Sequence, residues 1–172
     1  MICPHCGAEN IEGVDACAEC GQPLSDGYLP EPVTEVERCL LTDHVDTLAP
    51  KTPVVVAADT PVRDVLRTMV DRRIGCLIVA EAGKPVGVFT ERDALAKLHE
   101  NAAALGDRPV ADFMTAHPDT LQADAKVAFA VQRMDVGGYR HIPIVDRAGA
   151  LTGVISVRDI LDYLREKLEA EP

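Results

Sequence analysis

The sequence predicts an α+β protein in which one β-α-β-β-α unit occurs twice behind a small cysteine-bearing head. The first observation is an internal repeat, because residues 45–81 align with residues 110–146 at a constant offset of 65. The second is one extra residue in a turn of the second copy, after which residues 87–93 align with residues 153–159. The third is a CxxC…CxxC pattern near the N-terminus. A long repeat with one insertion at a turn indicates a duplicated structural unit.

The head contains two short knuckles, Cys3-Pro4-His5-Cys6-Gly7 and Cys17-Ala18-Glu19-Cys20-Gly21. Each CxxC turn aims two sulfur atoms at one ion, and the glycine that follows permits a positive φ. Four thiolates supply the tetrahedral set of a structural Zn²⁺ and leave no open position for a substrate. The predicted metal ligands are Cys3, Cys6, Cys17 and Cys20. The pattern resembles the zinc-ribbon family, built of β-hairpins, and iron in a rubredoxin-like site is the chemical alternative.

The first repeated unit begins with a short strand at residues 54–57. Thr60 is expected to N-cap the next helix, with Pro61 at its first position. Apolar residues then recur at helical spacing and predict one buried face. These residues are Val62, Val65, Leu66, Met69 and Val70.

Two strands joined by a tight turn follow, at residues 76–80 and 85–89. The helix after Thr90 is expected to turn Leu95 and Leu98 inward.

The second unit repeats this order of elements. Its strands are predicted at residues 141–145 and 151–155. Its first helix should bury Val127, Ala130, Val131 and Met134, and its last should bury Ile160, Leu161, Leu164 and Leu168. Each unit has a three-stranded sheet and two helices, which are too few to cover its apolar face. The two copies should therefore pack sheet against sheet.

A Gly-x-x-Thr/Ser-x-x-Asp motif closes both repeats, and the second also contains Arg140-His141-Ile142-Pro143-Ile144-Val145-Asp146. These residues resemble the tandem cystathionine-β-synthase (CBS) domain pair, or Bateman module, over residues 42–168. The resemblance implies a regulatory homodimer that binds adenosine-bearing ligands such as AMP, ADP, ATP or S-adenosylmethionine between its repeats. The expected organisation is a zinc ribbon at 1–24, a linker and start of a connecting helix at 25–41, and CBS repeats at 42–104 and 105–172.

Thr90 and Ser156 each end a strand and begin a helix, with Asp93 and Asp159 three residues later. This spacing is typical of a capping box. The same geometry could instead hold a phosphate at the helix N-terminus, while the carboxylate accepts both hydroxyls of a ribose. The two interpretations differ in whether each aspartate faces an open cleft or is consumed by the cap.

Charge distinguishes the two motifs. Arg140 and His141 stand where members of the resembled family place phosphate contacts, whereas the aligned Gly75 and Cys76 offer no charge. The second-repeat motif is therefore expected to bind a phosphorylated ligand more tightly. The candidate ligand-binding residues are Thr90, Asp93, Arg140, His141, Ser156 and Asp159.

Charge, composition and the absence of known motifs argue against several classes of function. The net charge is −11, and residues 1–24 contain four acids but no lysine or arginine, which argues against nucleic-acid binding. No apolar run approaches the roughly 18 residues of a membrane span. A cysteine at residue 3 leaves no room for a signal peptide, so we expect a cytoplasmic protein. No nucleophile elbow, phosphate-binding loop or dinucleotide turn is present, which favours a non-enzyme.

The main alternative is an interaction scaffold. In that interpretation the repeat pair serves only for dimerisation, and the zinc ribbon docks a protein partner.

Overall fold

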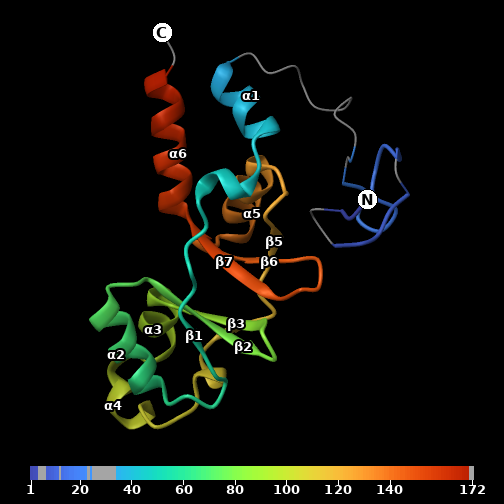
Figure 1. Ribbon diagram of the computed structural model, residues 1–172. Helices are drawn as coiled ribbons and strands as arrows, with labels where there is room; N and C mark the ends of the chain where they lie inside the picture. The colour runs from blue at the N-terminus through green and yellow to red at the C-terminus, as the bar shows by residue number, and fades with distance from the viewer. Residues whose placement is uncertain (4–6, 12, 23, 25–33, 171–172) are drawn as a thin grey trace.

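Residues 1–3, 7–11, 13–22, 24 and 34–170 are described by the computed structural model of the chain (Figure 1). The fold is α+β, as predicted, with helices around two small sheets. Among the described residues, no helix combines the length and the apolar character that a membrane crossing needs.

The first sheet has four strands in the order β1-β2-β3-β4. Strand β1 is parallel to β2, and the other neighbours are antiparallel. The strands are β1 (Val55–Val56), β2 (Cys76–Glu81), β3 (Lys84–Thr90) and β4 (Thr115–Ala116). The helices of this half are α2 (Val62–Arg72), α3 (Glu91–Lys97) and α4 (Ala102–Leu105), with 3₁₀ turns η3 (His99–Asn101) and η4 (Val110–Asp112).

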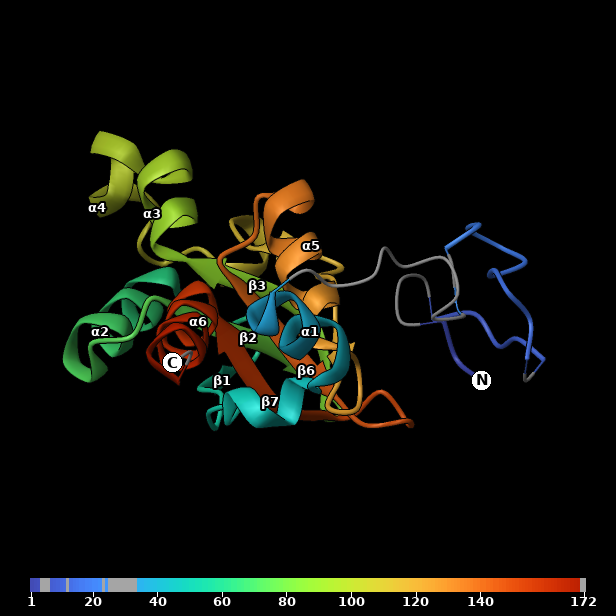
Figure 2. The same ribbon diagram turned by 90° about the horizontal axis from the view of Figure 1, so that it is seen from above.

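The second sheet has the order β5-β6-β7, again with one parallel and one antiparallel pair. Its strands are β5 (Leu121–Gln122), β6 (His141–Val145) and β7 (Leu151–Ser156). Around it lie α1 (Glu35–Thr42), the 3₁₀ turn η2 (Val45–Leu48), α5 (Val127–Gly137) and α6 (Val157–Ala170). Figures 1 and 2 show α2, α3 and α4 gathered on the first sheet and α1 beside α5 on the second. The predicted strands agree with the structure to within one residue at each end.

Each sheet is completed by a segment from the other half of the chain. Strand β4, which precedes the second unit, pairs with β3 through Ala116 opposite Gly87. At the equivalent place in the first unit, Lys51 forms a β-bridge with Val154 of β7, with N–H···O distances of 2.9 and 3.0 Å. These crossings were not predicted from the sequence, because short two-residue pairings leave no periodic pattern.

The glycines of the repeated motif make room for these crossings. A Cβ atom at Gly153 would lie 2.8 Å from Cβ of Pro50, and a Cβ atom at Gly87 would overlap the thioether of Met114. Glycine at these positions therefore allows the close backbone approach that joins the two units.

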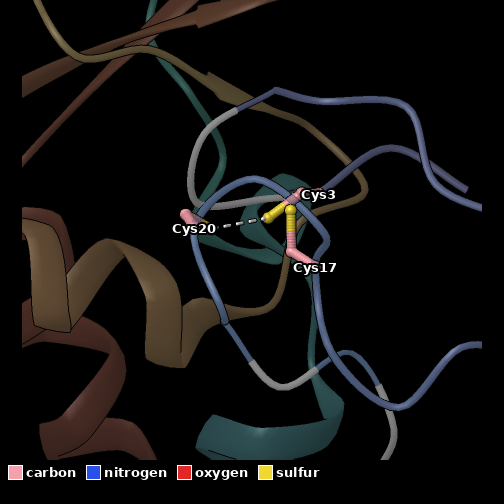
Figure 3. A group of neighbouring side chains, drawn as sticks. All are labelled: Cys3, Cys17 and Cys20. Carbon is pink, nitrogen blue, oxygen red and sulfur yellow. Dashed lines mark hydrogen bonds between the residues drawn. The ribbon is translucent and has the colours of Figure 1, made fainter.

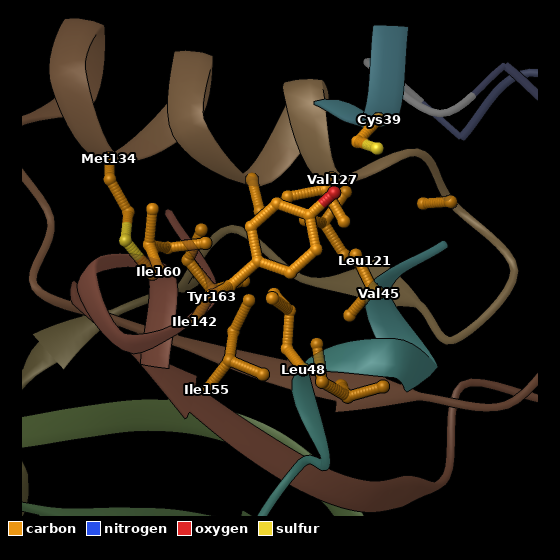
Figure 4. Close-up of a cluster of buried hydrophobic side chains, with 13 residues drawn as sticks. Cys39, Val45, Leu48, Leu121, Val127, Met134, Ile142, Ile155, Ile160 and Tyr163 are labelled. Atoms are coloured by element: carbon orange, nitrogen blue, oxygen red, sulfur yellow. The ribbon is translucent and has the colours of Figure 1, made fainter. Parts of the chain in front are cut away.

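Two main cores lie on the outer faces of the sheets, and each contains residues from both repeats. Val45 and Leu48, from the start of the first repeat, are buried with Ile142 and Ile155 in the core of the second unit (Figure 4). Val110 and Phe113, in turn, belong to the core of the first unit. The repeats have thus exchanged their leading segments.

The expected packing of sheet against sheet is present between the two halves. A smaller cluster joins buried Cys76, Ile78 and Val88 of the first sheet to Leu151 and Val154 of β7. The backbone N–H of Leu151 also donates to the carbonyl of Gly83 at 2.8 Å. This interface fixes the ends of β3 and β6 next to each other.

The prediction that Thr60 caps α2 is wrong. Pro61 occupies the N-cap position and no side chain accepts a capping hydrogen bond. The first free N–H groups of the helix, on Val62 and Arg63, donate instead to the carbonyls of Arg108 and Gly106. Residues 106–108 therefore accept the hydrogen bonds of the helix N-terminus that a capping side chain would otherwise accept.

Four apolar helix residues predicted to be buried are exposed. The exposed fractions are 75% for Val70, 77% for Leu95, 60% for Leu161 and 60% for Leu168. Their neighbours Met69, Leu98 and Ile160 are buried, at 6%, 2% and 5%. Each helix thus contacts its sheet along a narrow stripe, and helical spacing alone overestimates the width of that stripe.

Candidate functional site

A cavity of about 240 Å³ opens between the two units. Its walls come from the end of β3, the start of α3 and Thr115 of β4 in the first unit, and from residues 137–141 at the end of α5 and the start of β6 in the second. The lining residues are Gly75, Val88, Thr90, Glu91, Arg92, Asp93, Thr115, Pro118, Asp119, Gly137, Gly138, Tyr139, Arg140 and His141. The volume lies slightly below the roughly 300–1,000 Å³ of common small-molecule pockets.

Thr90 and Asp93 enter this cavity as a complete capping box. The backbone N–H and hydroxyl of Thr90 donate to Oδ2 of Asp93 at 3.0 and 2.6 Å, and the N–H of Asp93 donates to the Thr90 hydroxyl at 3.2 Å. Oδ1 of Asp93 accepts from the Thr115 hydroxyl at 3.1 Å and pairs with the Lys97 ammonium at 2.7 Å. The aspartate therefore lines the cavity and serves the cap at once.

This network sets the charge of the buried Asp93 carboxyl. Burial by itself raises its pKa, but hydrogen bonds from Lys97 and Thr90 outweigh burial and hold the pKa below its ordinary value. The four donors occupy the acceptor positions of both oxygens. A ribose hydroxyl would thus have to replace one of them, and the rotatable Thr115 hydroxyl is the easiest to displace.

Arg140 and His141 reach the same cavity from the start of β6. A Cβ atom at Gly75 would lie 3.4 Å from both Cε1 of His141 and Oε2 of Glu91, so Gly75 makes room for both side chains. Burial lowers the pKa of His141, although Glu91 and Asp159 oppose the shift. Nδ1 of His141 is buried without a hydrogen-bond partner in the described part of the chain. The ring is therefore a neutral polar group in the cavity wall.

The structure does not group these residues as the sequence analysis expected. Arg140 and His141 line the cavity with the first-repeat residues Thr90 and Asp93, whereas Ser156 and Asp159 are absent from its lining. The expected grouping of Arg140 and His141 with Ser156 and Asp159 thus differs from the lining of this cavity, although the charge of Asp159 also acts on His141. The physical reason is the packing of the two sheets, which sets the start of one repeat's strand beside the helix of the other.

In the second motif, at the start of α6, Asp159 bonds back to Ser156 as the acidic residue of a capping box does. The backbone N–H and hydroxyl of Ser156 both donate to Oδ2 of Asp159 at 2.7 Å. Oδ1 pairs with the Lys51 ammonium at 2.6 Å. Burial opposes ionisation of Asp159, but the hydrogen bonds from Lys51 and Ser156 prevail and lower its pKa.

Two further cavity residues, Arg92 and Tyr139, are not among the candidate ligand-binding residues predicted from the sequence. Arg92 donates from Nη1 to the carbonyl of Gly138 at 3.1 Å and so joins the two units across the cavity. Tyr139 is 36% exposed, and the charge of nearby Asp119 raises its pKa. The aligned position of Tyr139 in the first repeat is Ile74, so comparison of the repeats offered no signal for an aromatic residue here.

The structure describes three of the four cysteines that are predicted to bind the metal. The sulfur atoms of Cys3, Cys17 and Cys20 lie within 4.8 Å of one another, and those of Cys3 and Cys20 are 3.7 Å apart (Figure 3). A tetrahedral Zn²⁺ with Zn–S bonds of about 2.3 Å requires sulfur separations of about 3.8 Å. The three sulfurs thus fit such a site. Cys6 lies outside the described residues.

The backbone around the cysteines has the predicted knuckle geometry. Gly7 and Gly21 have φ of 75° and 72°, and their N–H groups donate to the carbonyls of Cys3 and Cys17 at 2.9 Å. Buried Asn10 donates to the Cys17 sulfur at 3.5 Å and accepts from the Ala18 N–H. Hydrogen bonds of this kind orient metal ligands from outside the coordination shell.

Comparison with known families follows the same division of the chain. The CBS domain profile matches residues 45–100 and 110–166, which together exceed half of the chain. The zinc-ribbon domain profile matches residues 2–24. The chain is 31% identical over 121 residues to an uncharacterized 17.7 kDa protein of Acidianus ambivalens, with coverage of 70% of this chain and 72% of that protein. It spans half or less of the length of two further curated relatives.

Solved structures share the arrangement of the two units. A CBS-domain containing protein of Agrobacterium tumefaciens, ATU1752, superposes with a TM-score of 0.65 at 27% identity, covering 70% of this chain and 98% of that one. The CBS domain protein PAE2072 of Pyrobaculum aerophilum, complexed with AMP, gives a TM-score of 0.63 at 26% identity, covering 74% of this chain and all of that one.

Proposed function

We propose that this chain, which belongs to the CBS domain family, is a regulatory protein that binds an adenosine-bearing ligand in the cavity between its two units. The observation that carries the proposal is the convergence of Thr90, Asp93, Arg140 and His141 on one cavity built from both repeats. The AMP complex of PAE2072 supports an adenine nucleotide as the ligand class.

Each of these residues has a role that its chemistry suits. Asp93 would accept the ribose hydroxyls in place of the Thr115 hydroxyl. The exposed Arg140 would hold a phosphate, and the unpaired Nδ1 of His141 would accept or donate one hydrogen bond.

The charges around the cavity favour a ligand with few phosphates. Glu91, Asp93 and Asp119 stand against Arg92 and Arg140 in its lining. The three carboxylates would repel a triphosphate more strongly than a monophosphate, and they would attract the sulfonium of S-adenosylmethionine. We therefore place AMP and S-adenosylmethionine ahead of ADP and ATP.

The test is isothermal titration calorimetry of the purified protein with AMP, ADP, ATP and S-adenosylmethionine. We expect saturable binding that weakens from AMP to ATP and that Arg140→Ala reduces for AMP. The exposed Arg165→Ala, on the far end of α6, is the matched control. Absence of binding by all four ligands, in a folded protein, would favour the scaffold alternative.

The zinc ribbon and the dimer belong to the same proposal. One structural Zn²⁺ would be held by Cys3, Cys6, Cys17 and Cys20. The ribbon would contact a protein partner whose binding depends on ligand occupancy.

A homodimer would cover apolar side chains that stand exposed at equivalent positions of the two repeats. These are Leu95 and Leu161.

A further inference from the structure

The aspartate of the second motif is held by a lysine from the opposite repeat. The side chain of Asp159 is 8% exposed, and that of Lys51 is 68% exposed. The two residues are 108 positions apart in the sequence, and their atoms approach to 2.6 Å. Lys51 reaches this position because its backbone is fixed to Val154 of β7 by the crossing bridge.

Among the described residues, the aspartate of the first motif pairs with no lysine from the opposite repeat, and its partner from that repeat is the uncharged hydroxyl of Thr115. Lys97, which pairs with Asp93, lies one turn further along the same helix, and its ammonium also donates to the carbonyls of Phe113 and Met114. It therefore comes from the same repeat as Asp93, and it also holds the segment of the second repeat that crosses the first sheet. The residue aligned with Lys51 is Ala116, which carries no charge. The lysine thus breaks the symmetry of the two motifs.

Lys51 also ends the segment that leads from α1 into the first unit. At the other end of this segment, Asp43 accepts from the Tyr163 hydroxyl at 2.9 Å and pairs with Lys167 at 2.8 Å. Asp159, Tyr163 and Lys167 are spaced four residues apart, so they share one face of α6. Residues 43–51 are therefore held along α6 by polar contacts at both ends.

We propose that Lys51 is an internal competitor for the second nucleotide motif. Its ammonium occupies the carboxylate that would otherwise accept ribose hydroxyls, so a ligand reaches Asp159 only when Lys51 leaves. That release frees one end of residues 43–51, which connect the binding units to α1 and the zinc ribbon. The inference rests on the proposed function and adds a link between ligand occupancy and the ribbon.

The ligand-free protein provides the first test. Lys51→Met keeps the length of the side chain but removes its charge. Amide hydrogen exchange should rise about two- to fivefold at Asp46 and Lys51, which donate to Ala123 and Val154, because the ion pair no longer restrains them. Lys84→Met is the control, since the Lys84 ammonium forms no ion pair among the described residues. An unchanged exchange rate in Lys51→Met would show that the ion pair does not restrain residues 43–51.

Ligand binding provides the second test, by calorimetry with AMP and with 2′,3′-dideoxy-AMP. The native protein and Lys84→Met should bind one equivalent of AMP, and Lys51→Met should bind a second. Both equivalents should weaken with the dideoxy ligand, because it lacks the hydroxyls that Asp93 and Asp159 would accept. Asp159→Asn should loosen residues 43–51 as Lys51→Met does but should not gain the second equivalent.

The outcomes separate the two proposals. One equivalent of AMP in both the native protein and Lys51→Met would overturn the competition by Lys51 and leave the proposed function intact. No AMP binding by either protein would overturn both. A second equivalent that persists with the dideoxy ligand would also overturn the competition, because binding would not depend on Asp159.

Discussion

At the scale of single residues, the two aspartates have the same cap but different surroundings. Both carboxylates are buried and both accept from the hydroxyl three residues earlier. Asp93 opens on the cavity with Arg140 and His141, whereas Asp159 is covered by Lys51. Local sequence therefore identifies the motif, and neighbours from the other repeat decide which copy lines the cavity.

The first prediction concerns this difference. Asp93→Asn should weaken AMP binding about ten- to a hundredfold, because hydrogen bonds to a charged group contribute roughly 1.5–3 kcal/mol. Asp159→Asn, the matched control, should leave the dissociation constant of the native site nearly unchanged. Calorimetric titration measures both. A larger loss of AMP affinity in Asp159→Asn than in Asp93→Asn would place the ligand at the second motif instead.

A second prediction concerns pH. Because burial lowers the pKa of His141 in the folded state, the unfolded state takes up a proton first as the pH falls through about 6.5. The folded protein should therefore lose free energy of unfolding between pH 7.5 and 5.5, and this loss should be smaller in His141→Gln. Urea denaturation at the two pH values measures it, with the exposed His99→Gln as control. Equal losses in the native protein and His141→Gln would contradict the prediction.

At the scale of elements, the crossing segments explain the glycines that the repeats share. Gly87 and Gly153 are the first residues of the repeated motif, and each lies under a segment from the other half of the chain. The helices, in contrast to the crossing segments, contact the sheets only along narrow stripes. Strand pairing between repeats, more than helix burial, therefore sets the position of the site.

We predict that Gly153→Ala lowers the free energy of unfolding by about 1–3 kcal/mol, as overpacking commonly does. The added methyl group would meet the rigid ring of Pro50. In Gly87→Ala the opposing group is the flexible thioether of Met114, so the loss should be smaller. Urea denaturation of the two variants compares them directly. A greater loss in Gly87→Ala would show that the crossing at Met114 is the tighter one.

At the scale of the whole molecule, the chain combines a two-unit body with a small cysteine site at its N-terminus. About 24 residues cannot bury a sufficient core, so the head should draw its folding energy from the metal. The body has two extensive cores of its own. The stability of the two parts should therefore respond differently to metal removal.

The fourth prediction tests this division. Elemental analysis should find about one zinc per chain, and Cys17→Ser should lose it while the thermal transition of the body persists. Cys39→Ala removes a thiol from the core of the second unit and should retain the metal. Iron in place of zinc, or zinc retained in Cys17→Ser, would contradict the four-cysteine assignment.

The last prediction is homodimerisation. Leu95 and Leu161 are 77% and 60% exposed at aligned positions, and a two-fold partner would cover such side chains. Light scattering should give a dimer at micromolar concentration and a monomer for the double variant Leu95→Glu/Leu161→Glu. Ile11→Glu, at an exposed position of the head, should remain dimeric. A monomeric native protein would contradict the prediction.

Features that depend on local chemistry and on repetition were predictable from the residues alone. The knuckle glycines, the hydrogen bonds of Thr90 with Asp93 and of Ser156 with Asp159, and the strand limits all follow from residue types within a few positions. Which side chains meet across the repeats depends on how the chain folds. Arg140 lies with Asp93, and Lys51 with Asp159, because the two repeats exchange their leading segments and pack sheet against sheet. Contacts between residues 47 and 108 positions apart leave no periodic trace in the chain.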